Sequence, residues 1–303
     1  MPTTEISDAA ARIRAGELVA FPTETVYGLG ANALDAGAVR KIFELKGRPE
    51  TSPLIVHVSS VEMARGIVSE WPDLAEELAA KFWPGPLTLV LPKRAAIPDI
   101  VTAGLPTVGV RMPDHPLALE LLREAGVPIA APSANKFTGI SPTTAAHVRE
   151  AFGDAVPVLD GGPARVGIES TVVAIEGGEL KLLRPGMISL GELEQVAARN
   201  GQAHPAPGMH EKHYSPRTPV LLVETPKELP DRAGAYLFRK KSGIVSRCVR
   251  MPMKADEYAA KLYAVLHEVD HENWPWIGVE MPPDKPEWAA IRDRLQRAAG
   301  RVS

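Results

Sequence analysis

Along the first 195 positions, stretches in which apolar residues have the spacing of a helix alternate with short apolar runs typical of strands. Positions with helical spacing predict helices over 8–14, 35–47, 69–83, 115–126 and 143–153. Short apolar runs between them predict strands over 18–23, 53–59, 87–92, 107–113, 127–135, 157–162, 170–177 and 180–186. Strands interleaved with helices are typical of an α/β domain, and we expect this domain to end near residue 195.

A stretch with neither period separates this pattern from the rest of the chain. Residues 199–219 are rich in Pro, Gly and His, and the stretch is longer than most connections within compact domains. Beyond it, strands over 219–224, 234–238 and 276–282 and helices over 254–272 and 286–300 predict a small α/β domain. We therefore expect a first domain over 1–198, a linker or lid over 199–219 and a second domain over 220–303.

Composition narrows the class of protein. The 303 residues carry a formal net charge of −3, and residues 1–200 hold 18 Lys and Arg against 24 Asp and Glu, so no basic nucleic-acid surface is expected. The single cysteine, Cys248, excludes an internal disulfide and a cysteine-based zinc site. Neither a signal peptide nor an apolar run of membrane length is visible, which favours a cytoplasmic protein without a membrane partner.

Four cations stand at the ends of predicted elements. Lys46 and Arg48 follow a helix, whereas Arg111 and Arg184 come at the ends of apolar strands. An arginine at the end of a core strand is costly unless an anion pairs with it, and its planar fork suits a carboxylate or a phosphate. A solvated surface cation is the commoner outcome for each residue alone. Several polar clusters at strand ends of one domain nevertheless favour an anion-binding site.

Hydroxyl groups lie near the same strand ends. Thr23, Thr25, Ser133, Ser141 and Thr171 fall in turns, where helix capping or turn formation is the alternative to ligand binding. The chain has no P-loop motif, no G-x-S-x-G elbow and no histidine pair at zinc spacing. Catalysis would therefore depend on positioning substrates and neutralising charge, which suffices for phosphoryl and nucleotidyl transfer.

Six sequence motifs, taken in order, resemble one known family. They read FPTETVYGLGANA, KGRP…PLIVHV, FWPGPLTLVL, VGVRMPDHP, APSANKFTGISPT and, in the linker, APGMHEKHYSP. The first five are similar to the YrdC-domain family, and the linker and the C-terminal tail resemble its two-domain members, the L-threonylcarbamoyladenylate synthases. The resemblance implies an α/β fold with a YrdC-like twisted sheet and a large concave cavity, followed by a small Rossmann-like α/β C-terminal domain.

The same resemblance implies an activity. Family members join L-threonine, bicarbonate and ATP into threonylcarbamoyl-AMP and release pyrophosphate, with Mg²⁺ carried by the ATP phosphates rather than by protein ligands. A downstream tRNA threonylcarbamoyl-transfer machinery then modifies the adenosine beside the anticodon, giving t6A in tRNAs that read codons beginning with A. No stable direct binding of nucleic acid is expected of this chain.

Residue roles follow from the motif positions that this sequence shares with the family. The ATP side is implied to comprise Lys46, Arg48, Ser52, Thr107, Ser133, Asn135, Ser141, Arg184, Tyr214 and Ser215, with Lys46 and Arg48 catalytic. The threonine side is implied to comprise Thr25, His57, Arg111, Ala131 and Thr171. Arg111 would hold the carboxylate of the amino acid and His57 its side chain or amine region. The linker, through His213, Tyr214 and Ser215, would cover ATP and exclude water; a plain tether is the alternative.

Three other functions remain open to a chain with these features. A related carbamoyl-transfer enzyme is one, because YrdC-type domains also occur in hydrogenase-maturation proteins, although the chain lacks their acylphosphatase and zinc-finger segments. A non-catalytic RNA-binding module is another, disfavoured by the acidic first domain and the few aromatic residues. The third is a regulatory sensor that binds ATP without turnover.

Overall fold

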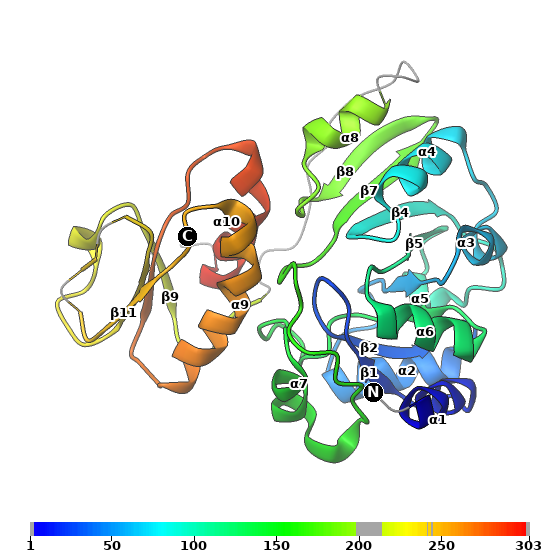
Figure 1. Cartoon of the computed structure of the whole chain (residues 1–303), viewed down its shortest axis with the longest axis horizontal. Coiled ribbons are helices and arrows are strands. Elements are labelled where there is room, and N and C mark those ends of the chain that lie inside the picture. Colours follow the sequence, from blue (N-terminus) through cyan, green and yellow to red (C-terminus); the bar gives the residue numbers. More distant parts are fainter. Residues whose placement is uncertain (1–2, 198–213, 241, 244, 301–303) are drawn as a thin grey trace.

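Figure 1 shows the computed structural model of the chain, which describes residues 3–197, 214–240, 242–243 and 245–300. These residues form an eight-stranded sheet and a separate four-stranded sheet, each accompanied by helices. The expected combination of a large α/β part and a smaller one is confirmed. We refer to the two parts as the large domain and the small domain.

The large sheet has the strand order β1-β2-β6-β3-β5-β4-β7-β8. Its strands are β1 (Val19–Phe21), β2 (Gly28–Asn32), β3 (Ile55–His57), β4 (Leu87–Pro92), β5 (Thr107–Arg111), β6 (Ile129–Ala130), β7 (Thr171–Glu176) and β8 (Glu179–Arg184). Strand β3 runs parallel to β5 and β4 runs parallel to β7, whereas the remaining neighbours are antiparallel. Carboxyl ends of some strands and amino ends of others therefore meet at the same edge.

Helices of the large domain pack around this sheet (Figure 1). They are α1 (Thr3–Arg14), α2 (Ala36–Lys46), α3 (Val61–Ile67), α4 (Asp73–Phe82), α5 (Asp99–Thr102), α6 (Pro116–Ala125), α7 (Ala145–Phe152) and α8 (Leu190–Ala197). In α2, the Asp35 side chain caps the first turn, and Gly47 ends the helix with a φ of 64°. Val39, Ile42 and Lys46 are all buried, so the apolar face of α2 carries one lysine into the interior.

The small domain is built on four parallel strands in the order β11-β10-β12-β9. They are β9 (Val220–Val223), β10 (Ala235–Phe238), β11 (Arg247–Arg250) and β12 (Ile277–Glu280), with helices α9 (Ala255–His271) and α10 (Ala289–Ala299). Every residue of the central strand β12 is buried, as a parallel strand covered on both faces requires.

The two domains share apolar packing. Figure 1 shows α9 and α10 between the small sheet and the large domain. Val26, Ile140 and Ile168 of the large domain belong to the same buried cluster as Leu262 and Tyr263 of α9. Apolar area that is removed from water at this boundary favours one fixed arrangement of the domains.

Some elements differ from the sequence predictions. The helix expected over 8–14 begins five residues earlier, at Thr3. The strand expected over 157–162 is wrong: Val158 makes a single isolated bridge to Ala20. The pattern also misses β2, α3, α5, α8 and β11. Strand β2 escapes notice because two of its five residues are glycines, and a Cβ at Gly30 would come within 2.8 Å of Phe21 and of Ile129 in β6.

Candidate active site

The mixed sheet brings four of the predicted residues to one edge of the sheet, by which we mean the side formed by the ends of several strands. His57 ends β3 and Arg111 ends β5, and the two residues are direct partners in the parallel register. Because β4 runs antiparallel to β5, the start of β4 lies at this edge, and so does Thr171, the first residue of the parallel strand β7. Arg184 ends β8 and pairs with Val172 beside it. Two arginines, one histidine and one threonine thus converge from four different strands.

Lys46 reaches from the end of α2 into the loop after β6. Its side chain is 3% exposed, and Nζ donates hydrogen bonds to the carbonyl oxygen of Ser133, at 2.6 Å, and to that of Asn135. Burial lowers the pKa of Lys46 well below its ordinary value, and the charges of Arg48 and Lys136 lower it further. Two predicted ATP-side segments, K-x-R and S-x-N, are therefore in direct contact.

Asn135 organises the loop that Lys46 holds. Its Nδ2 donates to the carbonyl oxygens of Lys136, at 2.7 Å, and Gly139, at 2.8 Å. Its Oδ1 is buried and accepts no hydrogen bond from the described residues. Ser133 forms an isolated bridge with Gly28 at the start of β2. The loop thus has a fixed backbone and presents one unused acceptor, which is a suitable feature for contact with a ligand.

Arg48 and Arg184 form the cationic part of the site. Arg48 Nη2 donates to the carbonyl oxygen of Pro53 at 3.1 Å, while Arg184 donates to the carbonyl oxygen and hydroxyl of Ser170 at 3.1 and 3.0 Å. Burial lowers the pKa of Arg48 to about 10; Tyr214 opposes this shift, and the charge of Arg184 adds to it. Among the ion pairs of the described residues, none involves either guanidinium group. Two nearby arginines with neutral partners favour binding of an anion.

Arg111 is paired with a carboxylate of the chain itself, and its role in holding the amino-acid substrate stays a prediction. Its Nη2 lies 2.6 Å from Oε1 of Glu24, and both side chains are buried, at 4% and 1% exposure. Its Nε donates to the carbonyl oxygen of Gly85 at 3.3 Å. His57 lies beside Arg111 and edge-on to Phe21, and burial, aided by the charge of Arg111, lowers the pKa of His57 to about 3. His57 is therefore neutral at physiological pH.

The remaining threonine-side residues hold the backbone in place. The hydroxyl groups of Thr25 and Thr23 are hydrogen-bonded at 2.8 Å. The Thr171 hydroxyl both donates to the carbonyl oxygen of Ile188, at 2.9 Å, and accepts from its N–H, at 3.2 Å. The Ala131 N–H donates to the backbone of β3 at 2.9 Å. These side chains are buried, and their contacts explain why the turns around the edge are well defined.

Ser141 and Tyr214 lie at the boundary between the domains. Ser141 Oγ donates to Oε1 of Glu169 at 2.6 Å, and Arg294 of α10 approaches Oε2 of the same carboxylate at 2.8 Å. Tyr214 stacks on Tyr263 of α9 and lies beneath the guanidinium group of Arg294. Its φ of 63° is in the left-handed region, which a tyrosine adopts only when surrounding contacts fix it.

Two predicted ATP-side residues lie near the strand ends opposite to the edge described above, and a third lies in the expected linker. Thr107 begins β5, and Ser52 lies in the turn before β3. The Ser215 N–H donates to the carbonyl oxygen of Thr138 at 3.0 Å, which holds the end of the expected linker against the loop after β6. His213 falls outside the described residues, as does most of the expected linker.

Comparison with known proteins gives the family. One family model, described as "Telomere recombination", matches residues 11–186, and another, described as "Threonylcarbamoyl-AMP synthase, C-terminal domain", matches residues 188–300. The threonylcarbamoyl-AMP synthase of Pyrococcus abyssi is 43% identical over 98% of this chain and 94% of its own. That of Bacillus subtilis is 42% identical over 98% and 93%. The chain belongs to the threonylcarbamoyl-AMP synthase family. It is an enzyme of the nucleotidyltransferase class.

Solved structures agree with this membership. A crystal structure of P. abyssi Sua5 complexed with L-threonine superimposes with a TM-score of 0.88 at 41% identity, covering 97% of this chain and 94% of that one. Escherichia coli YciO matches at a TM-score of 0.53 and 20% identity over 60% of this chain and 88% of its own, which shows the fold alone. The YrdC-like sheet and the added C-terminal domain, expected from the motifs, are confirmed.

Three residues of this synthase-family site are absent from the sequence predictions. Glu24 pairs with Arg111, Ser170 holds Arg184, and Glu169 receives Arg294. Glu24 directly follows a predicted strand, Glu169 directly precedes one and Ser170 begins it, and this is the signal that could have identified them. The partners of Glu24 and Glu169 are distant in sequence, so the roles of these two carboxylates become visible only in the folded chain.

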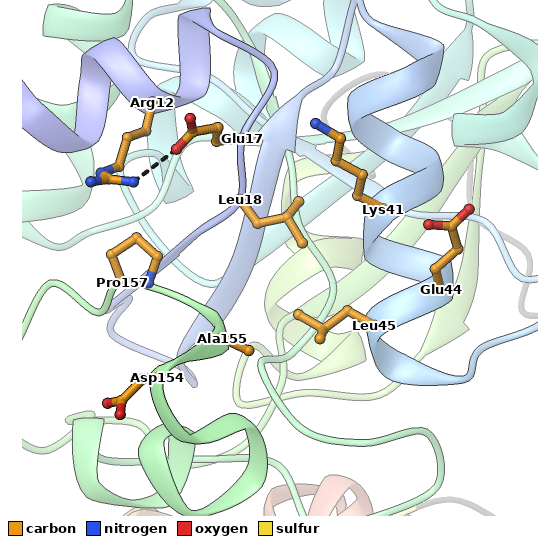
Figure 2. Close-up of a pocket in the computed structure, with 9 residues that line it drawn as sticks. All are labelled: Arg12, Glu17, Leu18, Lys41, Glu44, Leu45, Asp154, Ala155 and Pro157. Atoms are coloured by element: carbon orange, nitrogen blue, oxygen red, sulfur yellow. Dashed lines mark hydrogen bonds and ion pairs between the residues drawn. The ribbon is translucent and has the colours of Figure 1, made fainter.

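A pocket elsewhere on the large domain lies away from this site. Figure 2 shows it between α1, α2 and the segment after α7, with a volume of about 580 Å³. Its cations are already bonded: Arg12 pairs with Glu17 at 2.8 Å, and Lys41 donates to the carbonyl oxygen of Gly16 at 2.7 Å. No predicted site residue lines it. The large concave cavity expected over the sheet therefore stays a prediction.

Two further observations concern metals and membranes. The described part of the chain has no group of three or more His, Cys, Asp or Glu residues arranged to hold a metal ion. None of its helices is both long and apolar enough to cross a lipid bilayer.

Proposed function

We propose that this enzyme joins L-threonine, bicarbonate and ATP into L-threonylcarbamoyladenylate and releases pyrophosphate. The product would supply t6A modification of tRNAs that read codons beginning with A, through a separate transfer machinery. One observation carries the proposal: a cluster of buried or half-buried cations without carboxylate partners, Lys46, Arg48 and Arg184, occurs in the same domain as the buried pair of Arg111 and Glu24. The first part suits a polyphosphate and the second a small zwitterion.

The two halves divide the chemistry. Threonine would be held through its carboxylate at Arg111 and its hydroxyl or amine near the neutral His57, and its amine would take up CO₂ from bicarbonate to give N-carboxythreonine. The new carboxylate oxygen would attack the α-phosphorus of ATP in line, with pyrophosphate as the leaving group. Lys46, Arg48 and Arg184 would neutralise charge that develops on the phosphate oxygens.

The domain boundary supports exclusion of water from this reaction. A carbamate and a mixed anhydride both decompose in water, so a covered site is required. Tyr214 and Ser215, at the end of the expected linker, contact α10 and the loop after β6, which supports a place for them beside ATP. Closure over ATP, with a contribution from His213, is the expected role of residues 199–219.

Mg²⁺ would enter with ATP. The side chains around the predicted ATP side are cations, hydroxyl groups and an amide, and they do not fit a protein-held Mg²⁺, which prefers carboxylate oxygens. The phosphates would supply the ligands, and the ion would assist the departure of pyrophosphate.

Pyrophosphate release tests the proposal directly. The full chain is mixed with ATP, Mg²⁺, bicarbonate and L-threonine, and each component is omitted in turn. Release that requires all four is the expected result, and mass spectrometry should detect threonylcarbamoyl-AMP. Release that continues without threonine would overturn the proposal and favour other chemistry on the same fold. Binding of ATP without any release would instead favour a nucleotide sensor.

A further inference from the structure

Glu24 and Glu169 are both buried carboxylates paired with an arginine, but their surroundings differ. Both oxygens of Glu169 are hydrogen-bonded, to Ser141, Tyr263 and Arg294. Glu24 is 1% exposed; its Oε1 lies 2.6 Å from Nη2 of Arg111, whereas its Oε2 has no hydrogen-bond partner among the described residues. A carboxylate kept solely for structure is expected to have its oxygens satisfied, as Glu169 does.

The unsatisfied atoms belong to residues that adjoin one another. Besides Oε2 of Glu24, Nδ1 of His57 is buried and without a hydrogen-bond partner among the described residues. Arg111 adjoins His57 in the strand register and Glu24 through the ion pair. One carboxylate oxygen and one neutral imidazole nitrogen are thus unsatisfied beside a buried arginine, which indicates a polar ligand.

The backbone around Glu24 is held from both sides. The Thr23 hydroxyl donates to the carbonyl oxygen of Val26 at 2.7 Å, and the Val166 N–H donates to the carbonyl oxygen of Glu24 itself at 2.7 Å. The side chain therefore leaves from a fixed turn rather than a mobile loop. Such preorganisation is typical of a recognition group, because little conformational entropy remains to be lost on binding.

From this geometry we propose that Glu24 accepts a hydrogen bond from the amine of the amino-acid substrate while Arg111 binds its carboxylate. The inference rests on the proposed function, because it assigns one further residue to the same threonine site. A pair of fixed opposite charges matches the two charged ends of an α-amino acid. The amine has N–H donors whether or not it is protonated, so the contact persists when the neutral amine reacts.

Binding of two ligands tests the assignment. Isothermal titration compares L-threonine with 3-hydroxybutanoate, which keeps the carboxylate and the hydroxyl and lacks the amine. For the unmodified protein we expect threonine to bind about 10- to 100-fold more tightly, since loss of a buried charge-assisted hydrogen bond has an effect of this order. Glu24→Gln should weaken threonine binding and leave 3-hydroxybutanoate almost unchanged, so that the preference nearly disappears. Glu24→Asp, which keeps the charge, should retain part of it.

Two control variants separate recognition from stability. Arg111→Met should weaken both ligands alike, because both carry the carboxylate. Glu169→Gln removes the other buried carboxylate and should keep the preference for threonine. An unmodified protein that binds 3-hydroxybutanoate as tightly as threonine would overturn the role of Glu24, and so would an unchanged preference in Glu24→Gln or Glu24→Asp. A protein that binds neither ligand would instead contradict the proposed function itself.

Discussion

Glu169 of the large domain and Arg294 of the small domain form an ion pair across the domain boundary, with Oε2 2.8 Å from Nε and both side chains almost completely buried. Burial alone would raise the pKa of Glu169, but the charges of Arg294 and Arg184 and the hydrogen bond from Ser141 lower it below its ordinary value. Since Ser141 and Arg184 belong to the predicted ATP side, one carboxylate connects the small domain to the nucleotide half of the site.

Arg294→Met should destabilise the chain strongly. The substitution leaves the Glu169 charge buried with neutral donors only, and loss of one partner of a buried pair costs about 3–5 kcal/mol. Urea unfolding should therefore show a lower midpoint. Arg12→Met, which removes half-exposed pairs with Asp8 and Glu17, is the matched control and should leave the midpoint almost unchanged. Equal midpoints for the two variants would contradict the importance of the boundary pair.

Folding stability should decrease on acidification because of a histidine at the same boundary. Burial, reinforced by the stacked His147, lowers the pKa of His267 to about 4, whereas an unfolded histidine titrates near about 6.5. Between these values the unfolded chain binds more protons, so the stability from His267 is complete above pH 6.5 and is lost as the pH falls towards 4. His57 contributes a second decrease in this range.

The measurement is the thermal midpoint from pH 8 to pH 4 for the unmodified chain and for His267→Gln. The variant should have a shallower dependence on pH, with a residual slope from His57. Parallel curves would show that His267 does not titrate as its burial implies.

Local patterns predict positions that depend on one element, and α2 is an example. The spacing of Val39, Ile42 and Lys46 predicts their common face, and all three are buried. The contact of K-x-R with S-x-N follows from family resemblance rather than from spacing, because the residues that meet are almost 90 positions apart. Local periodicity in the sequence does not predict contacts between residues that are so far apart in the chain.

The partner of Arg111 illustrates the other limit. An arginine at a strand end predicts an anion, but the sequence offers many carboxylates, and Glu24 lies in the turn between β1 and β2, three strands from β5 in the sheet order. The folded chain, rather than a local pattern, brings Glu24 and Arg111 together. Strand 157–162 fails for the opposite reason: its residues have the right pattern, but only Val158 finds a strand neighbour.

Lys46→Met should impair ATP use more than folding. The change removes two hydrogen bonds to the loop after β6 and one positive charge, so KM for ATP should rise or pyrophosphate release should disappear. Lys41→Met is the matched control on the same helix, because Lys41 likewise donates to a backbone carbonyl oxygen, that of Gly16, away from the site. Similar losses of pyrophosphate release in both variants would show that the effect is structural.

Gly186→Ala should damage the site through the backbone. A Cβ at Gly186 would lie 2.3 Å from the N atom of Thr171 and 2.6 Å from its hydroxyl oxygen, so the segment after β8 would have to move away from β7. That movement should shift Arg184 and destabilise the chain by about 1–3 kcal/mol, as overpacking usually does. Gly191→Ala, in α8 with open space around its Cβ, should be neutral or slightly stabilising. Thermal unfolding and threonine titration of both variants would decide, and a Gly186→Ala protein equal to Gly191→Ala in both would contradict the close contact.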